Sequence, residues 1–258
     1  TMVVLAALIG GLSPFCSCGV IPLIAALLAS GVPLAPVMAF WLASPVIDPA
    51  MFVMTVGFLG LGFAIAKTAI AVGLGLTGGF AIVGLMRAGL FADPLRPGIG
   101  KSGCAAKLTL KPQPVAWRFW TDEDRRRTFV ASGGKALGFL GKWLTLAFVL
   151  ESLMIAYVPA ESITALVGGD GVMPVVIATL VGVPAYLNGY AALPLVDGLI
   201  EQGMAPGAGM AFLVAGGVTS LPAAIAVFAL TRLPLFATYV ALALTGSLAA
   251  GLLYGLVA

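Results

Sequence analysis

The sequence predicts an all-α protein, a polytopic bundle of transmembrane helices, and its composition is the first reason. Of the 258 residues, 61% are hydrophobic and 9% are charged, and the mean hydropathy is +1.13. Soluble domains carry about 25% charged residues. A soluble core of this size could not hide so much apolar surface, so we expect lipid to cover it.

The distribution of apolar residues is the second reason. They form seven stretches, at 2–30, 34–66, 68–86, 137–158, 172–200, 206–230 and 234–257. Each stretch is long enough to cross ~30 Å of hydrocarbon at ~1.5 Å per residue. Four of them contain interruptions rich in Pro, Gly and polar residues, at 13–19, 44–49, 182–189 and 216–222. Irregular backbone at membrane depth occurs only where it is buried in protein or lines a cavity, so we expect broken or re-entrant helices.

Charge divides the chain into three parts. Eleven of the 13 Lys and Arg residues lie between Arg87 and Lys142. The positive-inside rule predicts that this basic stretch is cytoplasmic. We expect a first transmembrane repeat at 1–90, a cytoplasmic linker at 91–134 and a second transmembrane repeat at 135–258 that includes one preceding helix. The expected location is the cell inner membrane. Nucleic acid is not an expected partner, because no soluble domain accompanies the basic stretch.

The two halves of the chain repeat at an interval of 172 positions. Pro22-Leu23 aligns with Pro194-Leu195, and Met38-Ala39-Phe40 aligns with Met210-Ala211-Phe212. After a short gap, Leu76-Thr77-Gly78 resembles Leu244-Thr245-Gly246. Two internal repeats with broken helices are typical of secondary transporters, in which the binding site lies at the repeat interface. The interval also puts Cys16 opposite Asn188, and the interruption at Asp48 opposite Ser220.

The relative orientation of the repeats depends on whether the interrupted stretches cross the membrane or turn back. If all cross, seven helices are present, the linker and the C-terminus are cytoplasmic, and the repeats are parallel. Lys67 and Arg232, the two cations outside the basic stretch, would then face the outside, against the positive-inside rule. Parallel and inverted arrangements both stay open.

Cys16 and Cys18 form the strongest local signal, because they lie two residues apart in an interruption bounded by Pro14 and Gly19. In an unwound segment both thiols can face one cavity, and a thiolate is a soft ligand for Cu(I) and for trivalent arsenic. The pair therefore predicts a site for a soft metal or metalloid. Two thiols without any His cannot close a structural zinc site, and no cofactor is expected. The alternatives are two small buried packing residues, or a strained, oxidising disulfide that exchanges electrons with a thioredoxin-like partner.

Here the sequence resembles a known family. The carrying segments are Pro14-Phe15-Cys16-Ser17-Cys18-Gly19-x-x-Pro22, Gly31-Val32-Pro33, Ala43-Ser44-Pro45-x-Ile47-Asp48-Pro49 and, in the second half, Gly182-x-Pro184-x-Tyr186-x-Asn188-Gly189. They resemble the signature of the predicted permeases that include the ArsP-type organoarsenical exporters, over nearly the whole chain. The resemblance implies export of trivalent organoarsenicals such as methylarsenite without an ATPase domain, with substrate binding at Cys16 and Cys18. The exporters tend to have Ser where this chain has Gly19, and many relatives with Gly there have no assigned substrate.

Other polar residues in the interruptions are candidates to line the same cavity. They are Ser17, Ser44, Asp48, Tyr186, Asn188, Tyr190 and Ser220. Ionisable groups inside spans are functional candidates, so Asp48 and Glu151 are candidates for proton coupling. Asp48 has a second interpretation, as a cap on the helix that begins at Pro49. Glu151 could instead pair with a polar group on a neighbouring helix, and the two tyrosines could simply pack.

These features predict a secondary transporter rather than an enzyme, one that exports a small thiophilic solute. No Ser-His-Asp or Cys-His arrangement exists, because the chain has no His. A membrane thiol-redox protein and a metal-ion permease are the alternatives, and the latter is disfavoured because Asp48 is the lone carboxylate in the interruptions. The expected partners are the lipid bilayer and the solute. A second copy of the chain and a thioredoxin-like protein are further candidates.

Overall fold

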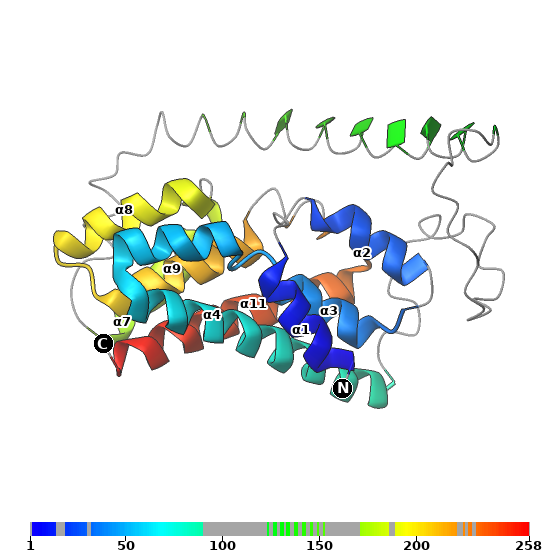
Figure 1. Ribbon diagram of the computed structural model, residues 1–258. Coiled ribbons are helices and arrows are strands. Elements are labelled where there is room, and N and C mark those ends of the chain that lie inside the picture. The colour runs from blue at the N-terminus through cyan, green and yellow to red at the C-terminus, as the bar shows by residue number, and fades with distance from the viewer. Residues whose placement is uncertain are drawn as a thin grey trace.

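In the computed structural model, the described part of the chain is helical and contains no strand. The structure describes residues 2–13, 19–29, 32–89, 171–185, 189–220 and 231–257, with isolated positions between 123 and 152 and between 224 and 228. Figure 1 shows the helices of the two halves packed into one elongated bundle. The prediction of an all-α protein is confirmed for these residues.

The first half begins with three short helices. These are α1 (Met2–Leu12), α2 (Val20–Ala29) and α3 (Leu34–Ala43). Each has 10 or 11 residues, which is only ~16 Å at ~1.5 Å per residue, about half of the hydrocarbon thickness. The stretch 2–30 therefore contains two short helices on either side of the predicted interruption, most of which lies outside the described residues. Helix α3 follows Pro33 and ends just before Ser44-Pro45, because Pro45 has no N–H to continue the helical hydrogen bonds.

Helix α4 (Pro49–Arg87) contains a sharp reversal at Gly60. Gly60 has φ 86° and ψ 165°, a conformation that a residue with a side chain rarely adopts. Lys67 Nζ lies 3.2 Å from the Met51 sulfur, whereas sixteen residues of straight helix would separate them by ~24 Å. The part before Gly60 therefore lies against the part after it. The sequence predicted a boundary between spans at Lys67, but the chain turns at Gly60 and Lys67 lies inside a continuous helical part.

The second half has the same succession of elements. It comprises α7 (Val172–Ala185), α8 (Gly189–Glu201), α9 (Pro206–Thr219) and α11 (Leu233–Gly255). Helices α9 and α11 each have a proline in their first turn, where a missing N–H costs nothing. Helix α9 packs against α7 and α11, as α3 packs against α1 and α4.

Among the described residues, two helices are long and apolar enough to cross a membrane. They are α4 and α11, whose most apolar windows have mean hydropathies of 2.0 and 1.7. Only 33% of each window is buried, so most of both surfaces faces outward. Large apolar side chains such as Ile65, Phe80 and Leu253 are exposed on them. A core helix of a soluble protein would bury these side chains, so this surface fits a lipid environment.

The part of α4 after Gly60 runs antiparallel to α11. The Phe63 and Tyr254 rings lie 5.1 Å apart, Leu74 packs on Gly246, and Gly78 faces Leu242. Along these three contacts, the residue numbers rise in α4 while they fall in α11. Continuing this order brings the start of α11, beside Arg232, level with Arg87 at the end of α4.

Close helix contacts in the two halves recur at the interval of 172 positions. A Cβ on Gly10 would lie 2.9 Å from the Phe40 carbonyl oxygen, and a Cβ on Gly182 would lie 2.9 Å from that of Phe212. A Cβ on Gly79 would meet Val3, Ala35 and Ala39, and a Cβ on Gly251 would meet Val175, Gly207 and Ala211. The interval of 172 positions therefore also relates contacts of α4 to contacts of α11. Residues 76–78 and 244–246 match in sequence at a different interval, so they do not occupy equivalent places in this packing.

Candidate functional site

The interruption after α3 forms a buried turn that leads into α4. Ser44 N–H donates to the Phe40 carbonyl at 3.0 Å, and Val46 N–H donates to the Ala43 carbonyl at 3.3 Å. Asp48 is extended, with φ −134°, and its Oδ1 accepts from Met51 N–H at 2.8 Å. Asp48 is therefore the N-cap of α4, as its second interpretation predicted. The Ser44 hydroxyl is buried and forms no hydrogen bond.

The corresponding interruption after α9 lies directly against this turn. A Cβ on Gly217 would lie 3.0 Å from the Pro45 carbonyl oxygen and 3.6 Å from the Val46 Cα. Ser220 leaves the helical conformation with ψ 146° and is 5% exposed. The ends of α3 and α9 thus meet inside the protein, where irregular backbone is tolerated.

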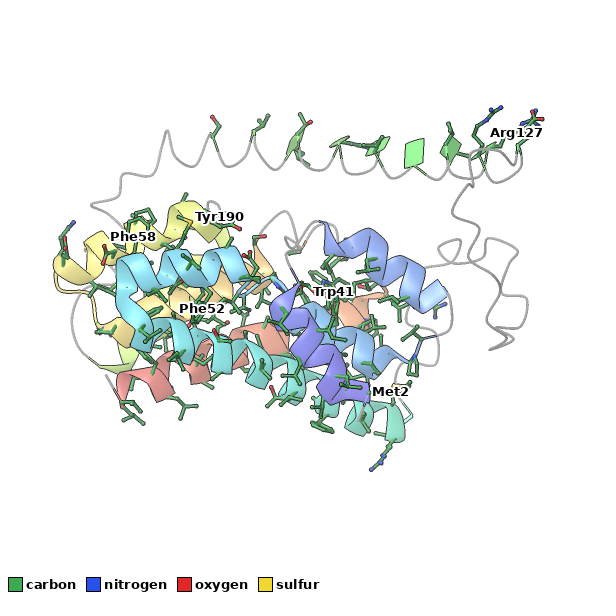
Figure 2. The ribbon with its side chains drawn as sticks, viewed as in Figure 1. Met2, Trp41, Phe52, Phe58, Arg127 and Tyr190 are labelled. Atoms are coloured by element: carbon green, nitrogen blue, oxygen red, sulfur yellow. The ribbon has the colours of Figure 1, made fainter. Side chains whose placement is uncertain are left out.

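Tyr239 braces the end of α9 from α11. Its hydroxyl donates to the Val218 carbonyl, and its ring lies 5.2 Å from that of Trp41, on α3. Both rings are fully buried, and Figure 2 shows Trp41 well inside the bundle. The phenol thereby satisfies a carbonyl in the last turn of α9, one of the groups that helix ends leave without an intrahelical partner.

We expect Tyr239→Phe to lower the free energy of unfolding by about 1–3 kcal/mol, because it leaves the buried Val218 carbonyl without its donor. Thermal unfolding in detergent measures this. Tyr254→Phe is the matched control on the same helix, since no described hydrogen bond involves the Tyr254 hydroxyl, and its effect should stay within about 0.5 kcal/mol. Equal stability of both variants would contradict a bracing role for Tyr239.

The structure brings together two of the predicted site residues from opposite halves of the chain. The Tyr190 hydroxyl, at the start of α8, donates to Asp48 Oδ2 at 3.2 Å and lies 3.5 Å from Oδ1. Tyr190 is 40% exposed and lies on the α8 side of the bundle in Figure 2. One carboxylate oxygen of Asp48 therefore accepts from the N-terminus of α4, and the carboxylate also accepts from the phenol of Tyr190, which belongs to the other half of the chain.

Lys67, which was not among the predicted site residues, lies near this group. Its side chain is 1% exposed, and its ammonium donates to the Met51 sulfur at 3.2 Å. Met51 therefore contacts both Lys67 and Asp48, which accepts from the Met51 N–H. A signal was present, because an ionisable residue inside an apolar stretch is a functional candidate. Drawing a span boundary at Lys67 concealed this signal.

Several predicted residues fall outside the described part of the chain. They are Cys16, Ser17, Cys18, Glu151, Tyr186 and Asn188. Of the candidates that the structure describes, Asp48 and Tyr190 are in contact, and Ser44 and Ser220 are buried at the two helix ends that meet. Within the described residues, no group of three or more His, Cys, Asp or Glu side chains is arranged to hold a metal ion.

Comparison with known proteins identifies the family. A family model described as "predicted permease" matches residues 1–256. UPF0718 protein MJ0584 from Methanocaldococcus jannaschii is 23% identical over 143 residues, which cover 55% of this chain and 39% of the relative. The match thus spans less than half of that relative's length. No solved structure matches the chain. The apolar, outward-facing helices agree with a membrane location, and the chain belongs to this family of predicted permeases.

Proposed function

We propose that the protein is a secondary transporter that exports a small thiophilic solute, such as a trivalent organoarsenical, across the cell inner membrane. The contact between the ends of α3 and α9 carries this proposal, because two broken helices that meet inside a membrane protein are typical of a transport site. The solute would bind at Cys16 and Cys18. Ser17, Ser44, Tyr186, Asn188, Tyr190 and Ser220 would line the cavity around it.

The packing supports two inverted repeats, one in each half. Equivalent contacts recur 172 positions apart, and the long helices α4 and α11 run antiparallel. Two such contacts join equivalent positions directly, Pro45 with Gly217 and Leu74 with Gly246. A two-fold axis relating the halves would pass through both contacts. Because the equivalent helices α4 and α11 are antiparallel, this two-fold axis would lie in the membrane plane. Many secondary transporters have an axis in this orientation.

An inverted arrangement also removes the conflict between Lys67, Arg232 and the positive-inside rule. The antiparallel order of α4 and α11 would bring Arg232 level with Arg87, so both cations would be on the side of the basic linker at 91–134, in the cytoplasm. Lys67 is buried and does not count as a loop charge. In this topology α1 and α2 form a re-entrant pair, whereas α3 and the first part of α4 together make one broken crossing.

The chemistry of binding is thiol exchange at arsenic. Methylarsenite, CH3As(OH)2, would form two As–S bonds with Cys16 and Cys18 while two As–O bonds break. The two thiol protons leave with the hydroxides as two molecules of water. The reverse reaction releases the solute on the other side. Soft-ligand exchange allows tight but reversible binding, which suits transport.

We expect everted membrane vesicles containing the protein to accumulate methylarsenite, and the double variant Cys16→Ser with Cys18→Ser to lose this accumulation, because serine oxygen is a poor ligand for arsenic. Cys104→Ser is the matched control, since Cys104 lies in the linker, and it should transport normally. Unchanged accumulation by the double variant would rule out the thiol mechanism. Activity that requires a disulfide and disappears in dithiothreitol would favour the redox alternative.

A further inference from the structure

A hydrogen bond between Tyr190 and Asp48 joins the two halves of the chain. The Tyr190 hydroxyl donates to Asp48 Oδ2 at 3.2 Å, across 142 positions of sequence. The contact of Gly217 with Pro45 also joins the halves, but it is a packing contact. A hydrogen bond is directional and is lost once its donor and acceptor separate beyond ~3.5 Å. The bond between Tyr190 and Asp48 is therefore sensitive to a movement of one half against the other.

The first part of α4 runs from the interior of the bundle to one end of it. It begins after Asp48, which follows the buried turn that meets α9. It ends at Gly60, and the ring of Phe63, just after the reversal, lies 5.1 Å from the ring of Tyr254 in the last turn of α11. In the proposed inverted topology this is the outer end of the bundle, because α11 begins on the cytoplasmic side.

Helix α8, from the other half, runs beside the first part of α4 to the same end. It begins at Gly189, ends at Glu201 and is joined to α9 by residues 202–205. A Cβ on Gly207, in the first turn of α9, would meet Gly251 near the end of α11. The end of α8 is therefore also near the outer end. Figure 1 shows α8 lying along the first part of α4, with which it is in contact.

The sequence provides no equivalent pair for the cytoplasmic side. At the interval of 172 positions, Ser220 is the equivalent of Asp48, and Cys18 is the equivalent of Tyr190. Helix α2 is likewise the equivalent of α8, and Figure 1 shows these two helices near opposite ends of the bundle. A hydroxyl and a thiol form weaker hydrogen bonds than a phenol and a carboxylate. The two sides of the protein are therefore not held together by the same chemistry.

We propose that the bond between Tyr190 and Asp48 is a latch that holds the outer side of the transporter closed and breaks each time that side opens. The inference rests on the proposed transporter with inverted repeats, but not on the identity of its solute. The two residues belong to different halves, so a movement of the halves that opens the outer side separates them. Tyr190 is 40% exposed and Asp48 is half-buried, so water can replace the bond when it breaks, and the latch is reversible.

Spin labels at the outer end of the bundle measure this opening directly. The labels are attached to Phe58→Cys on α4 and Glu201→Cys on α8, which are both exposed, in the full chain with its three natural cysteines replaced by serine. Electron paramagnetic resonance in liposomes gives the distribution of distances between the labels. We expect Tyr190→Phe to raise the ratio of long to short distances about two- to tenfold, the shift that the loss of one net hydrogen bond produces.

Asp48→Ser breaks the latch from the other half and keeps the helix cap. Serine is as good an N-cap as aspartate, but its side chain is too short to reach the phenol as well. It should shift the distances as Tyr190→Phe does, and the two changes together should shift them no further, because both remove the same bond. Tyr254→Phe is the matched control, since it removes a phenol hydroxyl at the same end of the bundle and should leave the distances unchanged.

Unchanged distances in Tyr190→Phe and Asp48→Ser would overturn the latch, even if both variants melted at a lower temperature, because the bond would then be merely structural. Additive shifts would also overturn it, because the two residues would not act through one bond. The measurement needs no solute, so its outcome is separate from that of transport. If the labels show the latch but vesicles do not accumulate methylarsenite, the proposed solute is wrong and the latch stands.

Discussion

Replacing Gly75 with valine is expected to lower the free energy of unfolding by about 3 kcal/mol, because it forces apart helices packed at backbone distance. A Cβ at Gly75 would lie 2.7 Å from the Ala39 carbonyl oxygen and close to the Cβ atoms of Ala43 and Ala7. The backbone carbonyl cannot rotate away as a side chain could. The substitution therefore separates α4 from α1 and α3 together. Helices in membranes depend on such small residues for close contact.

Gly73→Val is the matched control for this prediction. Gly73 is two residues away on the same helix, and a Cβ there would meet nothing within 4 Å. Its effect should stay within about 0.5 kcal/mol. Thermal unfolding and the yield of monodisperse protein in detergent compare the two variants. Equal melting temperatures would mean that α4 does not pack on α3 as described.

Replacing Asp48 with alanine is expected to have the second large effect, because one change removes two interactions. The N-cap bond to Met51 is worth about 0.5–2 kcal/mol. The phenol of Tyr190 loses its acceptor. We therefore expect a loss of about 1–3 kcal/mol, measured by thermal unfolding in detergent.

Asp48→Asn separates these contributions. Asparagine is as good an N-cap as aspartate, so this variant keeps the cap and removes the charge. Its melting temperature should lie between those of the wild type and Asp48→Ala. Tyr190→Phe removes the hydroxyl that donates to Asp48 but keeps the Asp48 cap and charge, and it should be the mildest of the three changes. If Asp48→Asn melts like wild type, the negative charge of Asp48 does not contribute to stability.

The sequence predicted those features that depend on local chemistry. Hydropathy was sufficient for the all-α class, and Ser44-Pro45 with Asp48-Pro49 marked the interruption correctly, because proline both ends and begins helices. The contact of Asp48 with Tyr190 involves two predicted residues. Their pairing across 142 positions depends on how the halves pack.

The features that were missed depend on tertiary structure. Gly60 and Gly75 both lie in an apolar stretch that is rich in glycine. Nothing in the neighbouring sequence indicates that Gly60 adopts a positive φ whereas Gly75 permits close helix packing. Lys67 looked like a loop charge because a lone cation among apolar residues is cheapest near a membrane surface. Its burial against Met51 depends on the reversal of the chain at Gly60, which only the structure shows.

The contacts that join equivalent positions have a consequence for the ancestry of the chain. Two copies of the first half assembled around the same axis would put Pro45 against Pro45 and Leu74 against Leu74, where glycines 217 and 246 now leave room. The present halves have therefore become non-interchangeable partners. A homodimer of the first half alone could not form this centre, which needs one copy of each half.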